Sequence, residues 1–84
     1  MRITLKLYAT LTDYLPADSR RDNQIQLEVE DGATIASIIA RQNLPPRLVH
    51  LVLVNGVFIS PSERAHYAFN EEDVLAIWPP IAGG

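Results

Sequence analysis

The hydrophobic period of the chain changes once, at Asp31-Gly32, and this change limits the folds open to it. Before it, apolar and polar residues alternate over residues 2–8 and again over residues 24–30, the pattern of strands with one buried face. After it, three isoleucines within residues 35–39 recur at the spacing of one helical face. The chain therefore combines strands with a helix.

The helix is predicted over residues 34–42, and both of its ends are marked. Thr34 can act as the N-cap, because its hydroxyl can accept a hydrogen bond from a free amide of the first turn. Asn43 can adopt the left-handed conformation at the C′ position, and Pro45-Pro46 prevents the helix from continuing. A helix this short persists only when it packs against a sheet.

Two apolar runs of another kind follow the helix. Residues 48–54 and 74–78 barely alternate, which is typical of strands that are covered on both faces or lie centrally in a sheet. Asn55-Gly56 is a strong hairpin signal, because a type I′ turn needs positive φ at both central positions. It predicts that residues 49–54 pair with a short strand at residues 57–60.

The order of elements is strand, strand, helix, strand, short strand, strand. With a right-handed crossover after the second strand, this order is consistent with an α+β fold of the β-grasp (ubiquitin-like) type, in which one main helix packs on one face of a mixed sheet of four to five strands. Other small α+β sheets fit the pattern alone. We place this domain at residues 1–78 and an extended, flexible C-terminal tail at residues 79–84.

Composition excludes several classes of function. The absence of cysteine rules out disulfide bonds, thiolate metal sites, iron–sulfur clusters and a cysteine nucleophile in this chain. The net charge of −3 and the pI near 5.1 argue against nucleic acid, which needs a basic face. Because no apolar run is long enough for a signal peptide or a membrane span, we expect a soluble, cytoplasmic protein.

Candidate catalytic groups are scarce. His50 and His66 lack a second ligand at metal-binding spacing, so we interpret each as a partly packed side chain and expect no metal. The acidic residues 71–73 are interpreted as a solvated strand entry rather than an acid/base pair. Gly32 and Gly56 are isolated turn residues, which leaves no phosphate-binding loop. The chain is not expected to be catalytic alone.

The carboxyl end has a different character. Pro79-Pro80 stops the last strand, since neither residue can donate to a sheet, and projects the chain outward. Ile81 and Ala82 then taper it to Gly83 and Gly84, which have no side chain. Such an end can thread a narrow channel and present its carboxylate to another protein's active site. The two glycines alone are also compatible with a frayed terminus.

These motifs together resemble the ubiquitin-like sulfur-carrier proteins of the MoaD/ThiS type, the family of the molybdopterin synthase small subunit and the thiazole-synthesis sulfur carrier. The resemblance covers essentially the whole chain, above all residues 31–34, 54–56 and 78–84. The terminal Gly-Gly is shared across the family, while Pro79-Pro80 is more typical of the molybdopterin synthase subunit. Residues 69–73 depart from the Asp-Gly-Asp turn that members commonly have there.

The resemblance implies a carrier mechanism. A partner of the ubiquitin-activating type would use ATP to adenylate Gly84, and a sulfur donor would convert the adenylate to a thiocarboxylate. The tail would then enter the large catalytic subunit of molybdopterin synthase and give up its sulfur. Gly83 would keep Cβ out of the channel, and residues 79–82 would position the tail. The chain itself would bind no cofactor. Three other roles stay open: a thiazole or other sulfur carrier, a ubiquitin-like modifier, and a plain β-grasp interaction module.

A docking surface is expected beside the tail. If the other residues of the strands face the helix, alternation places six residues on the opposite, open face: Tyr8, His50, Val52, Val54, Ala76 and Trp78. Of these, we expect Trp78, Tyr8, Val52 and Val54 to contact a partner. Packing of Trp78 into the core is the alternative.

Overall fold

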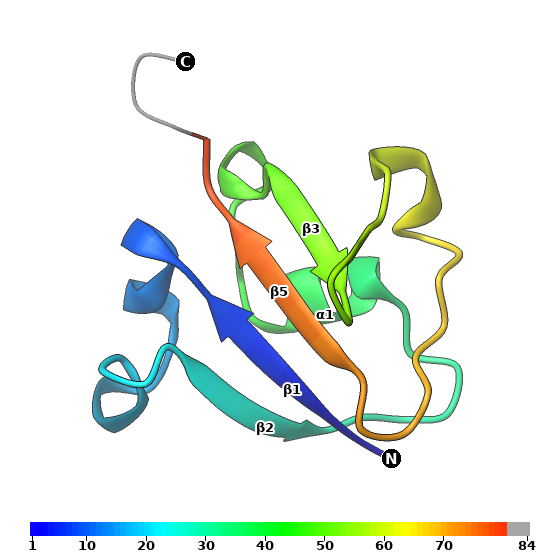
Figure 1. The fold of residues 1–84 in the computed structure, drawn as a ribbon, viewed down its shortest axis with the longest axis horizontal. Helices are drawn as coiled ribbons and strands as arrows, with labels where there is room; N and C mark the ends of the chain where they lie inside the picture. Colours follow the sequence, from blue (N-terminus) through cyan, green and yellow to red (C-terminus); the bar gives the residue numbers. More distant parts are fainter. Residues whose placement is uncertain (81–84) are drawn as a thin grey trace.

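Five strands form one mixed sheet in the computed structural model, which describes residues 1–80 (Figure 1). In chain order they are β1 (Arg2–Leu7), β2 (Gln24–Glu28), β3 (Leu51–Val54), β4 (Val57–Phe58) and β5 (Val74–Trp78). In space the order is β2-β1-β5-β3-β4. β1 and β5 run parallel, and the other neighbours are antiparallel.

One α-helix, α1 (Ile35–Arg41), lies across one face of this sheet (Figure 1). Four short 3-10 helices join the strands: η1 (Ala9–Tyr14), η2 (Ala17–Ser19), η3 (Pro46–Leu48) and η4 (Pro61–Glu63). The helix on a mixed sheet is the arrangement that the sequence predicts.

Both predicted caps of α1 are confirmed. Thr34 Oγ1 accepts from the Ser37 amide at 3.2 Å, and Ser37 Oγ accepts from the Thr34 amide at 2.9 Å, which makes a capping box. At the other end Asn43 has a φ of 58°, and the amides of Asn43 and Leu44 donate to carbonyls of the last turn. These are the two hydrogen bonds of a Schellman motif. The helix is thus closed at both ends by its own sequence.

β3 begins later and the hairpin is shorter than the sequence predicts. Residues 49–54 are predicted as strand, but η3 occupies Pro46–Leu48, and pairing with β5 starts only at Leu51. The turn at Asn55-Gly56 is confirmed, with φ of 51° and 82°. Its second strand ends at Phe58, two residues earlier than predicted.

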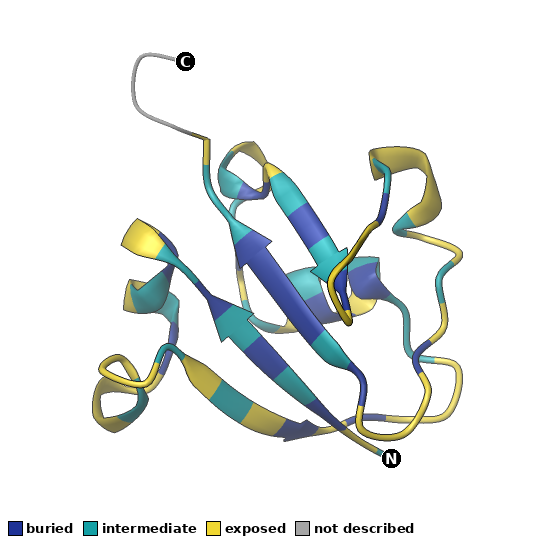
Figure 2. Cartoon of the chain, in the orientation of Figure 1, coloured by how far each residue is buried: buried dark blue, intermediate teal, exposed yellow. Residues whose placement is uncertain are grey.

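The core lies between α1 and the inner face of the sheet. Its fully buried side chains are Ile3, Leu5, Leu7, Leu11, Ile35, Ile38, Val52, Leu75 and Ile77. Along β1 the buried positions alternate with half-buried ones, whereas the middle of β5 is buried without interruption (Figure 2). β5 is therefore the centre of the fold, enclosed by β1 on one side and β3 on the other.

Asp73 is buried, although the sequence predicts a solvated acidic run at residues 71–73. Its side chain is 5% exposed, and its Oδ1 accepts from Asn55 Nδ2 at 2.8 Å. Its Oδ2 accepts from the Asn70 amide at 2.8 Å, while Asn55 Oδ1 accepts from the Val74 amide at 2.9 Å. The prediction is wrong for Asp73, which ties the β3–β4 turn to the start of β5. It holds for the other two residues, which are exposed.

Glu72 occupies a backbone conformation that suits glycine. Its φ is 69°, in the left-handed region where a Cβ costs roughly 1–2 kcal/mol. Its side chain is exposed. We predict that Glu72→Gly raises the free energy of unfolding by about 0.5–1 kcal/mol, because relief of the strain exceeds the added entropy of the unfolded chain. Glu72→Ala keeps the Cβ and serves as the control. Urea denaturation of both variants measures the difference, and equal stabilities would contradict the prediction.

Candidate functional site

The tail leaves the sheet from its central strand. The Tyr8 amide donates to the Ile77 carbonyl at 3.2 Å, and the His50 amide donates to the Trp78 carbonyl at 3.0 Å. β5 is thus hydrogen-bonded to β1 on one side and to the β3 side of the sheet on the other, up to its last residue. Pro79-Pro80 follows, and prolines have no N–H with which to extend the ladder. The chain therefore departs from a fixed point.

Four of the six predicted tail residues, the two reacting glycines and two that position them, lie outside the described residues. They are Ile81, Ala82, Gly83 and Gly84. Their predicted roles stay predictions. Of the two prolines before them, Pro79 is half-buried and Pro80 is exposed.

The face of the sheet opposite α1 has a polar half and an apolar half. Residues paired across a ladder project from the same face, so the registers assign each half. The polar half, on β1 and β2, holds Arg2, Thr4, Lys6, Gln24, Gln26 and Glu28. The apolar half, on β3, β4 and β5, holds Leu51, Leu53, Phe58, Val74, Ala76 and Trp78. We call one group of side chains on this face the apolar patch: Tyr8, Leu51, Leu53, Phe58 and Trp78.

Val52 and Val54 do not lie on this open face, so their prediction as partner contacts is wrong. They are 0% and 2% exposed and pair with Ile77 and Leu75 of β5, whose side chains are fully buried. The physical reason is a break in the alternation between η3 and β3: Val49 and Val52 are both buried although they are three positions apart, so β3 does not keep the phase set by Val49. The strand thereby faces the core with the opposite set of residues from the one expected.

Leu51 and Leu53 take the places of the two valines, and sequence reasoning missed them. They are half-buried and pair with Trp78 and Ala76. Residues 48–54 are all apolar except for one histidine, so no alternation tells which set faces the helix. Phe58 was also missed; its pairing with Leu53 extends the apolar patch to the edge strand.

Tyr8 and Trp78 lie together on the open face, where the sequence places them. Their ring centroids are 4.0 Å apart and the ring planes differ by 7°. Both side chains are half-buried, so Trp78 is not a core residue. Such stacked pairs contribute about 0.5–1.5 kcal/mol beyond their burial. The stack therefore holds the Trp78 ring beside the point where the tail departs.

Arg64 supports the tail exit from the irregular segment before β5. Its Nη1 donates to the Val49 carbonyl at 3.4 Å and its Nη2 to the His50 carbonyl at 3.2 Å. Its own carbonyl accepts from the Ala36 amide at 2.9 Å, and burial lowers the pKa of the guanidinium. The His50 amide donates to the carbonyl of Trp78, the last residue of β5. By binding the His50 carbonyl, Arg64 therefore stabilises the residue to which the end of β5 is hydrogen-bonded. No pattern in the sequence marks Arg64 for this role.

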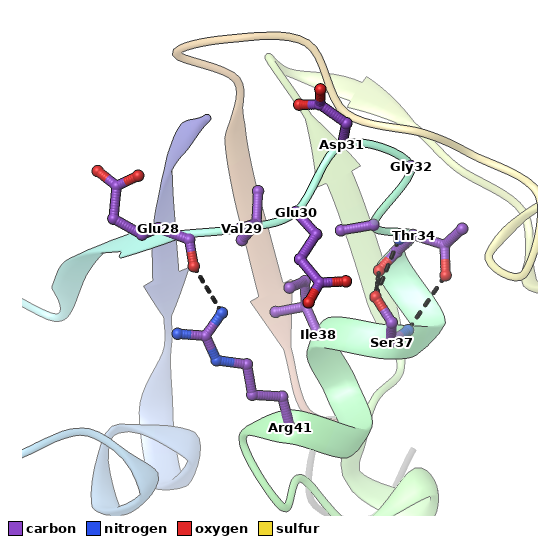
Figure 3. Close-up of a pocket in the computed structure, with 10 residues that line it drawn as sticks. Glu28, Val29, Glu30, Asp31, Gly32, Thr34, Ser37, Ile38 and Arg41 are labelled. Atoms are coloured by element: carbon purple, nitrogen blue, oxygen red, sulfur yellow. Dashed lines mark hydrogen bonds between the residues drawn. The ribbon is translucent and has the colours of Figure 1, made fainter.

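A cleft of about 630 Å³ lies at the other end of the sheet, between the β2–α1 connection and the helix (Figure 3). Arg41 Nη1 donates to the Glu28 carbonyl across it at 2.7 Å, and Glu30 extends toward α1. The Val29 amide donates to the Met1 carbonyl, which places the cleft at the start of β1. Because β1 and β5 run parallel, the cleft is remote from the tail exit.

Both histidines are exposed rather than partly packed. Within residues 1–80, no three His, Cys, Asp or Glu side chains gather at a point where they could hold a metal ion. No helix in the described part of the chain is both long and apolar enough to cross a membrane.

The architecture is shared with solved structures of small β-grasp proteins. SAMP1 from Haloferax volcanii is 23% identical, with a TM-score of 0.69 and 100% of both chains covered. A putative molybdopterin converting factor, subunit 1, from Pyrococcus furiosus is 15% identical, with a TM-score of 0.71, 96% of this chain and 99% of that chain covered. These likenesses confirm the β-grasp, ubiquitin-like fold.

A chain in the complex of subunits 1 and 2 of molybdopterin-converting factor from Helicobacter pylori 26695 has the same fold. It is 15% identical, with a TM-score of 0.61 and 100% of both chains covered. No curated protein matches the chain significantly. The model of the ThiS family, however, matches residues 7–84. The chain belongs to the ThiS family, which confirms its resemblance to the ubiquitin-like sulfur carriers.

The stack of Tyr8 on Trp78 can be tested by fluorescence, because Trp78 is the sole tryptophan. We predict that Tyr8→Ala moves the emission maximum to longer wavelength, since one face of the indole becomes exposed to water. Tyr8→Phe keeps an aromatic ring in place and should leave the maximum nearly unchanged. Equal spectra for the alanine and phenylalanine variants would contradict the stacked arrangement.

Proposed function

We propose that this protein is a sulfur carrier whose C-terminal Gly84 is adenylated, converted to a thiocarboxylate, and used to donate sulfur in molybdopterin biosynthesis. The observation that carries the proposal is the tail exit: the chain leaves a central strand, fixed on both sides up to Trp78, beside an apolar patch. Membership of the ThiS family supports it. The Pro79-Pro80 ending favours molybdopterin over thiazole as the destination of the sulfur.

The chemistry needs only the carboxylate of this chain. In the adenylating partner, an oxygen of the Gly84 carboxylate attacks the α-phosphorus of ATP and pyrophosphate leaves. Sulfide from a donor then attacks the acyl carbon, the bond to the phosphate oxygen breaks, and AMP leaves, so that Gly84 ends in a thiocarboxylate. The partner binds the ATP, so the carrier needs no cofactor of its own, and the need for ATP supports the expected cytoplasmic location. The absence of cysteine fits, since the sulfur resides on the chain end.

The residues before Gly84 serve insertion into a partner. Gly83 presents no Cβ, so a channel around the reacting carbon can be narrow. Pro79-Pro80 restricts the backbone of the exit, which lowers the entropy lost when the tail is held. Ile81 and Ala82 offer apolar contacts to the channel wall.

The apolar patch is the proposed docking surface for both partners. Exposed apolar groups that gather on one face of a small domain mark interaction sites, and aromatic residues dominate the energy of such sites. The complex of subunits 1 and 2 of the Helicobacter pylori factor supports the large catalytic subunit of molybdopterin synthase as one partner. The other partner is the adenylating enzyme.

A modifier function is the second candidate, in which Gly84 is joined to lysines of target proteins. The shared fold with SAMP1, also described as small archaeal modifier protein 1, favours it. Accumulation of high-mass conjugates in cells, lost when Gly84 is deleted, would select this function over sulfur transfer. A plain interaction module would keep partner binding after the same deletion.

Intact-mass measurement tests the carrier function directly. We predict that incubation with the adenylating enzyme, ATP and sulfide replaces one oxygen of the C-terminal peptide by sulfur. Deletion of Gly84 should abolish the change, because the truncated end no longer places its carboxylate at the reacting position. An unchanged mass of the intact chain in the presence of an active enzyme would overturn the proposal.

The docking surface can be tested with two neighbouring residues that point to opposite faces. Phe58 pairs with Leu53 in the apolar patch, whereas Val57 pairs with buried Val54, and both are exposed, at 55% and 64%. We predict that Phe58→Ser raises the Kd for the adenylating enzyme about tenfold, since an exposed aromatic contact is lost. Val57→Ser is the matched control and should change the Kd less than about twofold. Equal effects of the two substitutions in a calorimetric titration would exclude the patch as the docking surface.

A further inference from the structure

The chain has one lysine. Lys6 carries the sole side-chain amine of the 84 residues, beside six arginines, although lysine is among the commonest residues of soluble domains. Arginine does not replace lysine as a nucleophile, because its guanidinium stays protonated. In the proposed function, the activated carboxyl end is an acyl electrophile that can react with an amine of a second copy. The position of Lys6 therefore determines which side chain of that copy can be acylated.

Lys6 lies on the open face, at the border between its polar and apolar halves. Its ladder partners are Gln24 on β2 and Ala76 on β5, and Tyr8 follows two residues later on the same face. The side chain is half-buried, and among residues 1–80 no carboxylate lies within ion-pair distance of its amine. Lys6 is therefore a reachable amine adjacent to the Tyr8–Trp78 stack.

The other amine of the chain, at Met1, is less available. It donates a hydrogen bond to the Val29 carbonyl at 2.8 Å and is partly buried. It also lies at the start of β1, whereas Lys6 lies near the end of that strand, close to the tail exit.

We propose that Lys6 is an acyl-acceptor site, at which the activated Gly84 of a second copy forms an isopeptide bond that closes the apolar patch. The inference rests on the proposed function, which supplies the acyl-adenylate. The neutral Lys6 Nζ attacks the Gly84 carbonyl carbon and a C–N bond forms. The bond from that carbon to the phosphate oxygen breaks, AMP leaves with the electron pair, and the amine releases its proton to solvent.

Dimensions explain why such a bond closes the patch. The six residues after Trp78 span at most about 20 Å when fully extended. The described domain measures 36 × 31 × 22 Å, so a copy attached to Lys6 stays within about one domain width of it. Because Lys6 is adjacent to the Tyr8–Trp78 stack, the attached copy obstructs the approach of partners to the apolar patch.

The test is incubation with the adenylating enzyme and ATP in the absence of a sulfur donor. We expect a covalent dimer, detected by intact mass, with Gly84 joined to Lys6 in the tryptic map. Lys6→Arg keeps the charge and the stem and should yield no such dimer. Hydroxylamine, added in parallel, traps the acyl-adenylate as a hydroxamate and reports adenylation independently of Lys6. In the purified dimer, the free Gly84 should form hydroxamate at least about tenfold more slowly than Gly84 of the monomer.

The outcomes separate the two proposals. The absence of hydroxamate from both proteins overturns the proposed function. Hydroxamate without a dimer, or a dimer linked through Met1, overturns the assignment of Lys6 while the proposed function stands. A linked dimer that is adenylated as fast as the monomer overturns the closure of the apolar patch.

Discussion

The position of β5 between β1 and β3 is the constraint on which the rest of the structure depends. A last strand at the edge of a sheet would leave one side of its backbone free, and the chain end would move with it. Here the Tyr8 and His50 amides hold the carbonyls of Ile77 and Trp78. The tail thus begins from a backbone that is satisfied on both sides, and the geometry of the exit is set by the whole sheet rather than by a local turn.

The same arrangement explains where the proposed interaction surface lies. A sheet with a helix on one face leaves its other face to water, unless a partner covers it. In this protein the half of that face nearest the tail is apolar and holds a stacked Tyr8–Trp78 pair, while the far half is polar. The proposed docking surface and the tail exit therefore lie beside each other, so one binding event would bring the tail to the active site of the proposed partner.

Features that depend on residues close in sequence could be predicted, whereas features that depend on contacts between distant residues could not. The caps at Thr34 and Asn43 depend on neighbours within a few residues, and both were confirmed. The sequence could not predict which residues of β3 face the core. The run is apolar almost throughout, so it shows no alternation, and η3 moves the start of the strand. Asp73 was mistaken for a solvated residue because Asn55, its partner, is eighteen positions away. The predicted tail chemistry depends on residues 81–84, which lie outside the described range.

The central strand also has a consequence for the order in which the sheet forms. β1 and β3 are joined in the sheet only through β5, which follows both of them in the sequence. Pairings between residues so distant in sequence form late and cooperatively. The sheet therefore cannot be assembled around its centre before β5 has been synthesised. The apolar patch and the strand that leads into the tail become complete in the same step, so a polypeptide that lacks β5 has neither of them.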